Sequence, residues 1–158
     1  MKALVKRATK EDLKEVIANI READKEEIES ASGLSYEKTL ERILDTCDNC
    51  WAGFADGDLI AIFGVHVKSS LSGYGIPWMI STKKIEKHGK LFLRYCRPVF
   101  KKMCINMDVL VNYVHDRNDV AKMWLKWLGF DIKPAKPYGA KQELFCRFEL
   151  LMKGKNYV

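Results

Sequence analysis

The sharpest hydrophobic pattern is a helical stripe in the last third of the chain. Apolar residues recur there at intervals of three and four: Val120, Met123, Trp124, Trp127 and Leu128. This spacing places all of them on one face of a single helix. Asn118 precedes the stripe and can cap the first turn, and Gly129 follows it, where a left-handed backbone costs little. The pattern predicts a short amphipathic helix, with a strand beginning at Phe130.

Alternating apolar and polar runs predict a mixed order of strands and helices along the rest of the chain. Expected strands lie at about residues 5–9, 50–55, 59–68, 76–81, 108–115, from 130 onward and at 143–151; expected helices lie at about 10–22, 35–47 and 88–103. Asp56-Gly57-Asp58 predicts a hairpin turn. Pro98 should kink or split its helix. The charged stretch 22–32 allows either a ragged helix or a loop, and a proline- and glycine-rich loop is expected at 134–140.

Length and composition favour one globular domain over residues 1–158. No apolar run approaches the roughly 20 residues of a membrane span, and the N-terminal residues lack the apolar core of a signal peptide. The five cysteines are an odd number, so reduced thiols in a cytosolic setting are expected. Cys47 and Cys50 have CxxC spacing, but no second ligand pair follows at a suitable distance. We therefore expect two unrelated thiols and no metal site.

The net charge of +6 is unevenly distributed along the chain. Residues 1–48 carry nine Lys and Arg against twelve Asp and Glu, and the remainder carries eighteen against nine. A basic surface of this kind suits an anionic ligand or partner, such as nucleotide phosphates, nucleic acid or an acidic protein. A solvated basic face is the more common explanation for a charge this modest, so we do not expect nucleic acid to be the main partner.

Several segments together resemble a known family. The series Asn118, Ala121 and Gly129-Phe130 is similar to the C-terminal signature of the GNAT acyltransferases. The segments 77–82, 92–98, 110–114, 137–139 and 145–148 resemble the GNAT-like proteins of tailed bacteriophages, which include an internal virion protein of short-tailed phages. The resemblance covers about residues 50–150. It implies a phage or prophage origin, with the protein in the host cytoplasm or in the virion.

The resemblance implies an α/β fold of the GNAT type. Its central mixed sheet has parallel fourth and fifth strands that splay apart, and about four helices flank the sheet. Acetyl-CoA would lie between the splayed strands. The residues implied in binding it are Met79, Ile80, Ser81, Lys84, Lys87, His88, Gly89, Lys90 and Asn118. Lys84 and Lys87 replace the Gln/Arg and the first glycine of the family's pyrophosphate loop. A basic cluster surrounds this segment: Lys83, Lys84, Lys87, Lys90, Arg94, Arg97, Lys101 and Lys102.

The catalytic groups that the family uses are only partly present. Its tyrosine, which protonates the departing thiolate, falls on Leu125, and leucine cannot donate a proton. His115 is the best candidate base because imidazole titrates near neutrality, and Tyr113 is the nearby phenol that can replace the tyrosine. His115 can also be a surface residue that helps to cap the next helix.

Two functions follow from these residues. The first is an acetyl-CoA-dependent N-acyltransferase that acts on an amine of a small molecule or protein, with a degenerate site. The second is a non-catalytic GNAT-fold phage protein that contacts virion or host proteins through its basic face.

Overall fold

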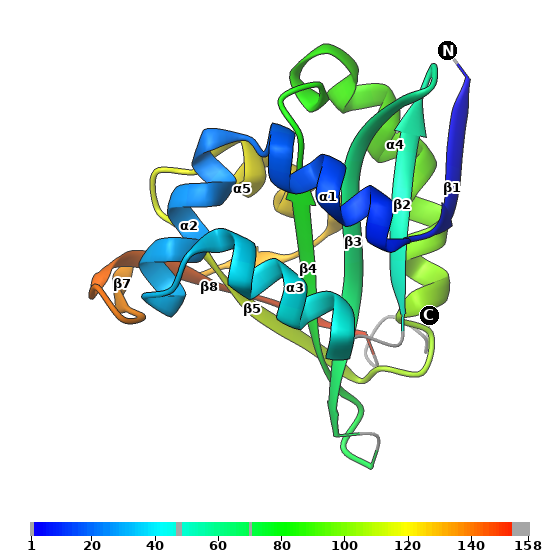
Figure 1. Cartoon of the computed structure of the whole chain (residues 1–158). Coiled ribbons are helices and arrows are strands. Elements are labelled where there is room, and N and C mark those ends of the chain that lie inside the picture. Colours follow the sequence, from blue (N-terminus) through cyan, green and yellow to red (C-terminus); the bar gives the residue numbers. More distant parts are fainter. Residues whose placement is uncertain (1, 47–48, 70, 153–158) are drawn as a thin grey trace.

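A mixed eight-stranded sheet runs through the computed structural model of the chain (Figure 1). The structure describes residues 2–46, 49–69 and 71–152. The strands are β1 (Ala3–Arg7), β2 (Cys50–Ala55), β3 (Asp58–Ser69), β4 (Tyr74–Ser81), β5 (Val109–His115), β6 (Asp131–Ile132), β7 (Lys136–Tyr138) and β8 (Glu143–Leu151). Their order across the sheet is β1-β2-β3-β4-β5-β8-β6, and β7 pairs with β8 beside β6. The predicted mixed sheet is confirmed.

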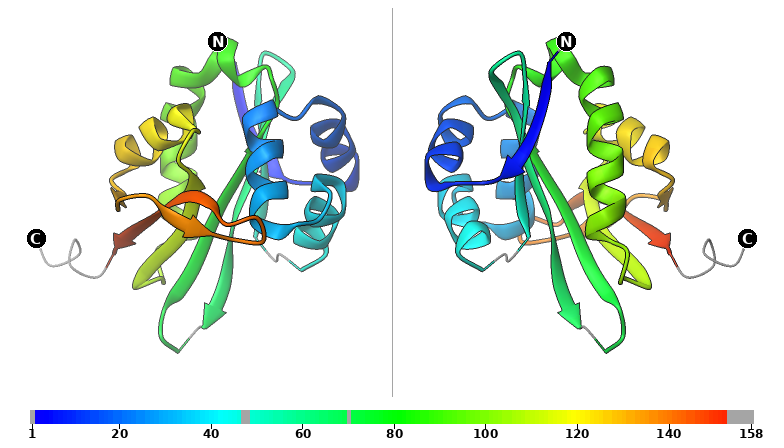
Figure 2. Two further views of the ribbon diagram at one scale, coloured as in Figure 1. Left: turned by 90° about the vertical axis from the view of Figure 1, so that its left-hand side faces the viewer. Right: turned by 90° about the vertical axis from the view of Figure 1, so that its right-hand side faces the viewer.

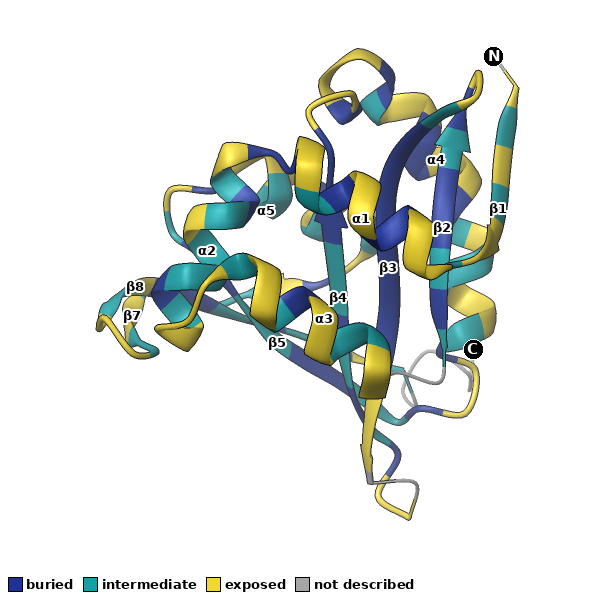
Figure 3. Cartoon of the chain, in the orientation of Figure 1, coloured by how far each residue is buried: buried dark blue, intermediate teal, exposed yellow. Residues whose placement is uncertain are grey.

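Helices cover both faces of this sheet, as the two side views in Figure 2 show. One face carries α1 (Lys10–Asn19), α2 (Glu22–Ser32) and α3 (Tyr36–Thr46), and the other carries α4 (Ile85–Met103) and α5 (Asp119–Leu128). Below, these are the α2–α3 side and the α4–α5 side. The helices of the described chain therefore number five, one more than the sequence suggested, because residues 22–32 form a regular helix. In Figure 3 the dark, buried residues concentrate on the central strands between the two layers.

The first helix ends earlier than predicted because the chain leaves it to pair with the end of β4. Ile20 takes an extended conformation and forms an antiparallel bridge with Thr82. The Arg21 amide donates to the Ser81 carbonyl at 3.0 Å, and the Lys83 amide donates to the Asn19 carbonyl at the same distance. These bonds hold the α1–α2 connection beside the end of β4 and place α2 over that end.

The predicted parallel pairing and splay of β4 and β5 are confirmed. The two strands pair only at Tyr74 with Val109 and at Gly75 with Leu110. The next β4 residue that faces β5 is Pro77, which has no amide to donate. Its carbonyl instead accepts from the Asn112 side-chain amide at 2.7 Å. Beyond this bridge the strands diverge, and a gap opens in the middle of the sheet.

The bounds of the two helices that follow the splayed strands, α4 and α5, were not predicted equally well from the sequence. In α5, Asn118 accepts from the Ala121 amide at 3.4 Å and Gly129 ends the helix with a φ of 101°, as predicted. In contrast, α4 begins at Ile85, earlier than the expected residue 88, and it continues through Pro98 without being split. Its inward face, which includes the 1% exposed Phe92, packs on the sheet and offsets the backbone bond that proline removes.

The region after α5 contains a short strand where a loop was predicted. Residues 136–138 pair with β8 as β7, although Pro137 lies within them. Proline is tolerated on an edge strand, which explains how the segment combines a loop-like composition with strand pairing. No helix in the described ranges is long and apolar enough to span a membrane.

Candidate active site

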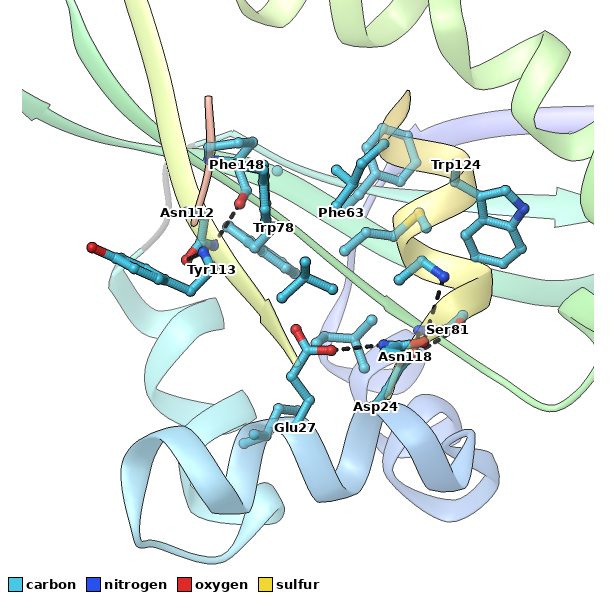
Figure 4. A pocket seen from close by; sticks show the side chains of 18 of the residues that line it. Asp24, Glu27, Phe63, Trp78, Ser81, Asn112, Tyr113, Asn118, Trp124 and Phe148 are labelled. Atoms are coloured by element: carbon cyan, nitrogen blue, oxygen red, sulfur yellow. Dashed lines mark hydrogen bonds between the residues drawn. The ribbon is translucent and has the colours of Figure 1, made fainter. Parts of the chain in front are cut away.

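A cavity of about 340 Å³ passes through the gap between β4 and β5. Residues from both helical layers and from the strands between them line it (Figure 4). The α2–α3 side contributes Asp24, Glu27, Ile28, Thr39 and Ile43, the α4–α5 side contributes Leu93, Phe100, Ala121, Trp124 and Leu125, and the strands contribute Phe63, Trp78, Met79, Ser81, Tyr113 and Phe148. Most of these side chains are apolar, and the charged groups among the lining residues are Arg21, Asp24 and Glu27.

Two carboxylates of α2 accept hydrogen bonds from the ends of the splayed strands. Asp24 and Glu27 lie three residues apart and therefore project from the same helix face. Asp24 Oδ2 accepts from the Ser81 amide at 2.8 Å and from the Ser81 hydroxyl at 2.6 Å. Glu27 accepts from the His115 amide and, through Oε2, from the Asn118 side-chain amide at 2.6 Å. Asp24 thus bonds to the end of β4, and Glu27 bonds to the end of β5.

Arg21 and Asn118 join these two carboxylates into one network. Arg21 Nη2 donates to Asp24 Oδ1 at 2.9 Å and to Asn118 Oδ1 at 2.8 Å. The guanidinium also lies 5.7 Å from the centre of the Trp124 ring, within the range of a cation–π contact. Because Asn118 is the N-cap of α5, the network connects α2, the end of β4 and the start of α5.

The environment of Glu27 suits proton exchange near neutral pH. Burial raises the pKa of Glu27 to about 7, against the opposing effects of its bonds from Asn118 and from the His115 amide. In Figure 4 the carboxyl group points from α2 into the cavity. A base whose pKa is close to the working pH balances the fraction ionised against the driving force for proton transfer.

The structure brings together only part of the residue set implied by the family resemblance. Met79, Ile80, Ser81, Tyr113 and Asn118 line the cavity. The segment that resembles the pyrophosphate loop, comprising Lys84, Lys87, His88, Gly89 and Lys90, does not line it. Nor does His115. The cavity and the basic segment are therefore separate features of the described chain.

The segment that resembles the pyrophosphate loop is a tight helix start. The Ile85 amide donates to the Thr82 carbonyl at 3.1 Å, and the Lys87 amide donates to the Lys84 carbonyl at 3.1 Å. Gly89 lies inside α4, and a Cβ atom there would meet Trp124 at an ordinary 3.5 Å. The first amides of α4 are thus bonded within the chain, and packing against the rest of the protein does not require glycine at position 89.

Two side chains of this segment contact Asp58 at the start of β3. Lys84 Nζ lies 3.0 Å from Asp58 Oδ1, and the buried His88 ring lies 3.7 Å from Asp58 Oδ2. The hydrogen bond from Lys84 lowers the pKa of Asp58. Lys84 therefore already has an anionic partner, whereas Lys83, Lys87 and Lys90 are exposed around the helix start.

His115 is held by contacts outside the cavity. Its Nδ1 accepts from the Arg117 amide at 3.1 Å, so Nε2 carries the proton and donates to Glu143 Oε1 at 3.1 Å. This bond lowers the pKa of Glu143. His115 is 7% exposed and is therefore buried, so the alternative interpretation of it as a surface residue is wrong. Its role as the catalytic base stays a prediction.

Tyr113 lies at the edge of the cavity with its ring stacked on Tyr138. The ring centroids are 3.8 Å apart, with an angle of 14° between the planes. In Figure 4 the Tyr113 hydroxyl points away from Glu27 and Ser81. Tyr113 thus contributes an aromatic surface here, and its role as proton donor also stays a prediction.

The three charged residues of this network were not predicted from the sequence. Arg21, Asp24 and Glu27 fall in a stretch whose many charges suggested a ragged helix or a loop. The sequence does contain a pattern that indicates their position. Asp24, Glu27, Ile28 and Ala31 recur at helical spacing and form one stripe. A carboxylate within such a stripe faces the protein interior when the helix packs.

The described residues contain no group of three His, Cys, Asp or Glu side chains arranged to hold a metal ion. Cys50 is buried in β2, and Cys47, the other member of the CxxC spacing, lies outside the described residues.

Known structures share this fold. No protein-family model matches the sequence, and no curated protein matches it. A spermidine N-acetyltransferase chimera from Vibrio cholerae and hSSAT superposes with a TM-score of 0.70 at 13% identity, covering 100% of both chains. The Vibrio cholerae spermidine N-acetyltransferase in complex with CoA and spermine gives 0.67 at 15% identity, covering 96% of each chain. A Bacillus subtilis acetyltransferase in complex with CoA gives 0.63 at 10% identity, covering 96% of this chain and 98% of that one.

These similarities establish the GNAT fold for the chain. At such low identity they establish the fold alone, because one fold can carry many functions. None of the three supports a phage origin, which remains a hypothesis based on the sequence.

Proposed function

We propose that this chain is an acetyl-CoA-dependent N-acetyltransferase whose reaction takes place in the cavity between β4 and β5. The observation that carries the proposal is Glu27, a carboxyl group with a pKa of about 7 that points into an apolar cavity at the gap in the sheet. Such a cavity, with few polar groups and one perturbed acid, is typical of an active site. The GNAT fold adds support.

The described residues suit two parts of acetyl-CoA, the apolar thioester arm and the charged phosphates. The cavity volume of about 340 Å³ lies in the range of small-molecule sites, and Leu93, Phe100 and Leu125 give its α4–α5 side an apolar wall suited to the thioester arm. The phosphates would depend on the ammonium groups of Lys83, Lys87 and Lys90, because the first amides of α4 are bonded within the chain.

Glu27 has a defined task in this reaction. Acetyl-CoA supplies the acetyl thioester: the amine nitrogen bonds to the carbonyl carbon, the carbon–sulfur bond breaks, and CoA leaves. The proton lost by the amine passes to Glu27, which must be ionised to receive it. Leu125, which lines the cavity at the position of the family's tyrosine, cannot protonate the leaving sulfur, so that proton comes from solvent or from Tyr113, which also lines the cavity. We therefore expect slow turnover.

The second candidate is a non-catalytic GNAT-fold protein that contacts a virion or host protein. The bonded amides at the start of α4 favour it, because they offer no open backbone cradle for a pyrophosphate. The basic residues of α4 would then serve a macromolecular partner. A phage origin belongs to this candidate and to the first one alike.

Acetyl transfer to a panel of primary amines tests the proposal. Glu27→Gln keeps the size of the side chain and removes the base, so kcat should fall by about 100-fold or more. The wild-type rate should decline as the pH falls through about 7, because Glu27 becomes protonated. Glu26→Gln is the matched control, since Glu26 is exposed on the same helix, and its rate should stay close to that of wild type.

Two results would contradict the proposal. One is transfer by wild type that Glu27→Gln leaves unchanged, which would move the chemistry to another base such as His115. The other is the absence of transfer to any amine at millimolar acetyl-CoA, which would favour the non-catalytic candidate.

A further inference from the structure

The wall of the cavity on the α2–α3 side has a distinctive composition. Ile28, Ile43 and Trp78 form an apolar surface there, and Tyr138 adds a second aromatic ring that is stacked on Tyr113. Thr39 lies beside them on α3 and lines the same space. Flat rings and branched aliphatic side chains favour a flat apolar group over a strongly hydrated one. This composition limits what kind of molecule can enter from that side.

Of the two carboxylates among the described residues that line the cavity, one is available to a cation. Both oxygens of Asp24 are engaged, with Arg21 on Oδ1 and Ser81 on Oδ2. In contrast, Glu27 receives its hydrogen bonds from the uncharged amides of Asn118 and His115. A cationic ligand can therefore form its ion pair with Glu27 without breaking the Arg21–Asp24 pair. Glu27 can thus form an ion pair with one positive charge of a ligand.

The charge of the surrounding helices favours a cation on this side of the sheet. The segment that forms α1, α2 and α3, residues 10–46, carries six Lys and Arg against eleven Asp and Glu. On the opposite face, α4 carries six Lys and Arg against Glu86 alone. An acidic layer attracts cationic ligands, and a basic layer attracts anionic ones. The cavity connects the two layers, so its ends favour ligands of opposite charge.

We propose that the acceptor bound on the α2–α3 side is a monoamine attached to one flat apolar body, of the arylalkylamine class. Its ammonium group contacts Glu27, and its ring lies against Trp78 and Ile43. This inference rests on the proposed acetyltransferase function and specifies its substrate. It departs from the spermine bound by the similar structure from Vibrio cholerae. A polyamine carries several charges, and the second carboxylate of this cavity, Asp24, is already neutralised by Arg21.

Calorimetric titration with 2-phenylethylamine and with spermine tests the proposal, with and without saturating CoA. Phenylethylamine should bind wild type at least about tenfold more tightly than spermine, since each unpaired buried charge weakens binding. Glu27→Gln should weaken phenylethylamine binding by about tenfold or more, because the ion pair is lost. Thr39→Lys places an ammonium group in the wall of the cavity and should weaken phenylethylamine binding by a similar factor. Glu37→Gln makes the same change in charge on the exposed side of α3 and is the matched control.

Acetyl-CoA binding, measured separately, distinguishes failure of this inference from failure of the proposed function. If acetyl-CoA binds but spermine binds as tightly as phenylethylamine, or neither amine binds, the substrate assignment is wrong and the acetyltransferase proposal survives. If Thr39→Lys and Glu37→Gln behave alike, the amine does not enter on the α2–α3 side. If neither acetyl-CoA nor any amine binds, both proposals fail.

Discussion

At Glu27, burial and hydrogen bonding act on the pKa in opposite directions. Removal from water raises the pKa of the carboxyl group to about 7, and the bonds from Asn118 and from the His115 amide only partly oppose this rise. Asp24, one helical turn earlier, has a cationic partner in Arg21 and serves as a structural link to β4. Two carboxylates on one helix face therefore have different tasks, and their surroundings determine which one exchanges a proton.

The raised pKa of Glu27 makes a specific prediction for stability. The folded protein holds the Glu27 proton up to about pH 7, whereas a glutamate in the unfolded chain loses it near pH 4.5. The free energy of unfolding should therefore fall as the pH rises from about 4.5 to about 7. Allowing for partial exposure, wild type should lose about 2 kcal/mol relative to Glu27→Gln between pH 5 and pH 8.

Urea unfolding of both proteins at the two pH values measures this difference. The comparison cancels every other titrating group that the two proteins share. Parallel pH dependences of wild type and Glu27→Gln would mean that Glu27 is ionised across the whole range and is not suited to the role of base.

At the scale of elements, the sequence predicts those helices and turns whose ends are fixed by their own capping or turn residues. Asn118 and Gly129 fix the two ends of α5, and Asp56-Gly57-Asp58 fixes the hairpin between β2 and β3. The end of α1 and the packing of α2 were not foreseen, because they depend on Ser81 and Thr82, which lie about 60 residues away. The gap between β4 and β5 was therefore implied by the family resemblance, whereas the position of α2 over that gap was not predicted.

The same distinction explains the site residues. Ser81 and Asn118 could be implied from a family pattern because they lie on elements that the pattern contains. Glu27 could not, since its importance arises from the bridge between Ile20 and Thr82 that brings α2 over the gap. The helix was expected only from about residue 88, and the bonds that close the first amides of α4, which begins at Ile85, are visible only in three dimensions.

Two glycines on packed elements should respond differently to replacement by alanine. A Cβ atom at Gly53 in β2 would overlap the Phe92 ring of α4, so Gly53→Ala should destabilise the protein by about 1–3 kcal/mol. Gly89 lies inside α4 and has room for a Cβ atom, so Gly89→Ala should stabilise it by up to about 1 kcal/mol.

Thermal unfolding of the two variants, together with acetyl-CoA titration of Gly89→Ala, measures these effects. Unchanged acetyl-CoA affinity in Gly89→Ala is expected if lysine side chains hold the phosphates. A large loss of affinity with retained stability would instead show that the backbone at Gly89 approaches the pyrophosphate, as the family resemblance implies.

For the whole molecule, the arrangement of charge follows the arrangement of layers. The acidic helices α1–α3 cover one face of the sheet, and the basic helix α4 covers the other (Figure 2). The cavity passes between these faces at the only place where neighbouring strands of the described sheet run parallel and separate. This geometry suits a reaction in which a cationic amine and an anionic acyl donor approach from opposite sides.

Calorimetric titration with acetyl-CoA tests this account most directly. Wild type should show saturable one-to-one binding that weakens as salt is added, because lysines contact the phosphates. Leu125→Trp fills the cavity from α5 and should reduce the affinity by about tenfold or more, since overpacking a filled apolar space typically costs about 1–3 kcal/mol. Met123→Trp, at a 62% exposed position on the same helix, should bind as wild type does. The absence of binding at millimolar acetyl-CoA, or equal affinity for wild type and a folded Leu125→Trp, would contradict the account.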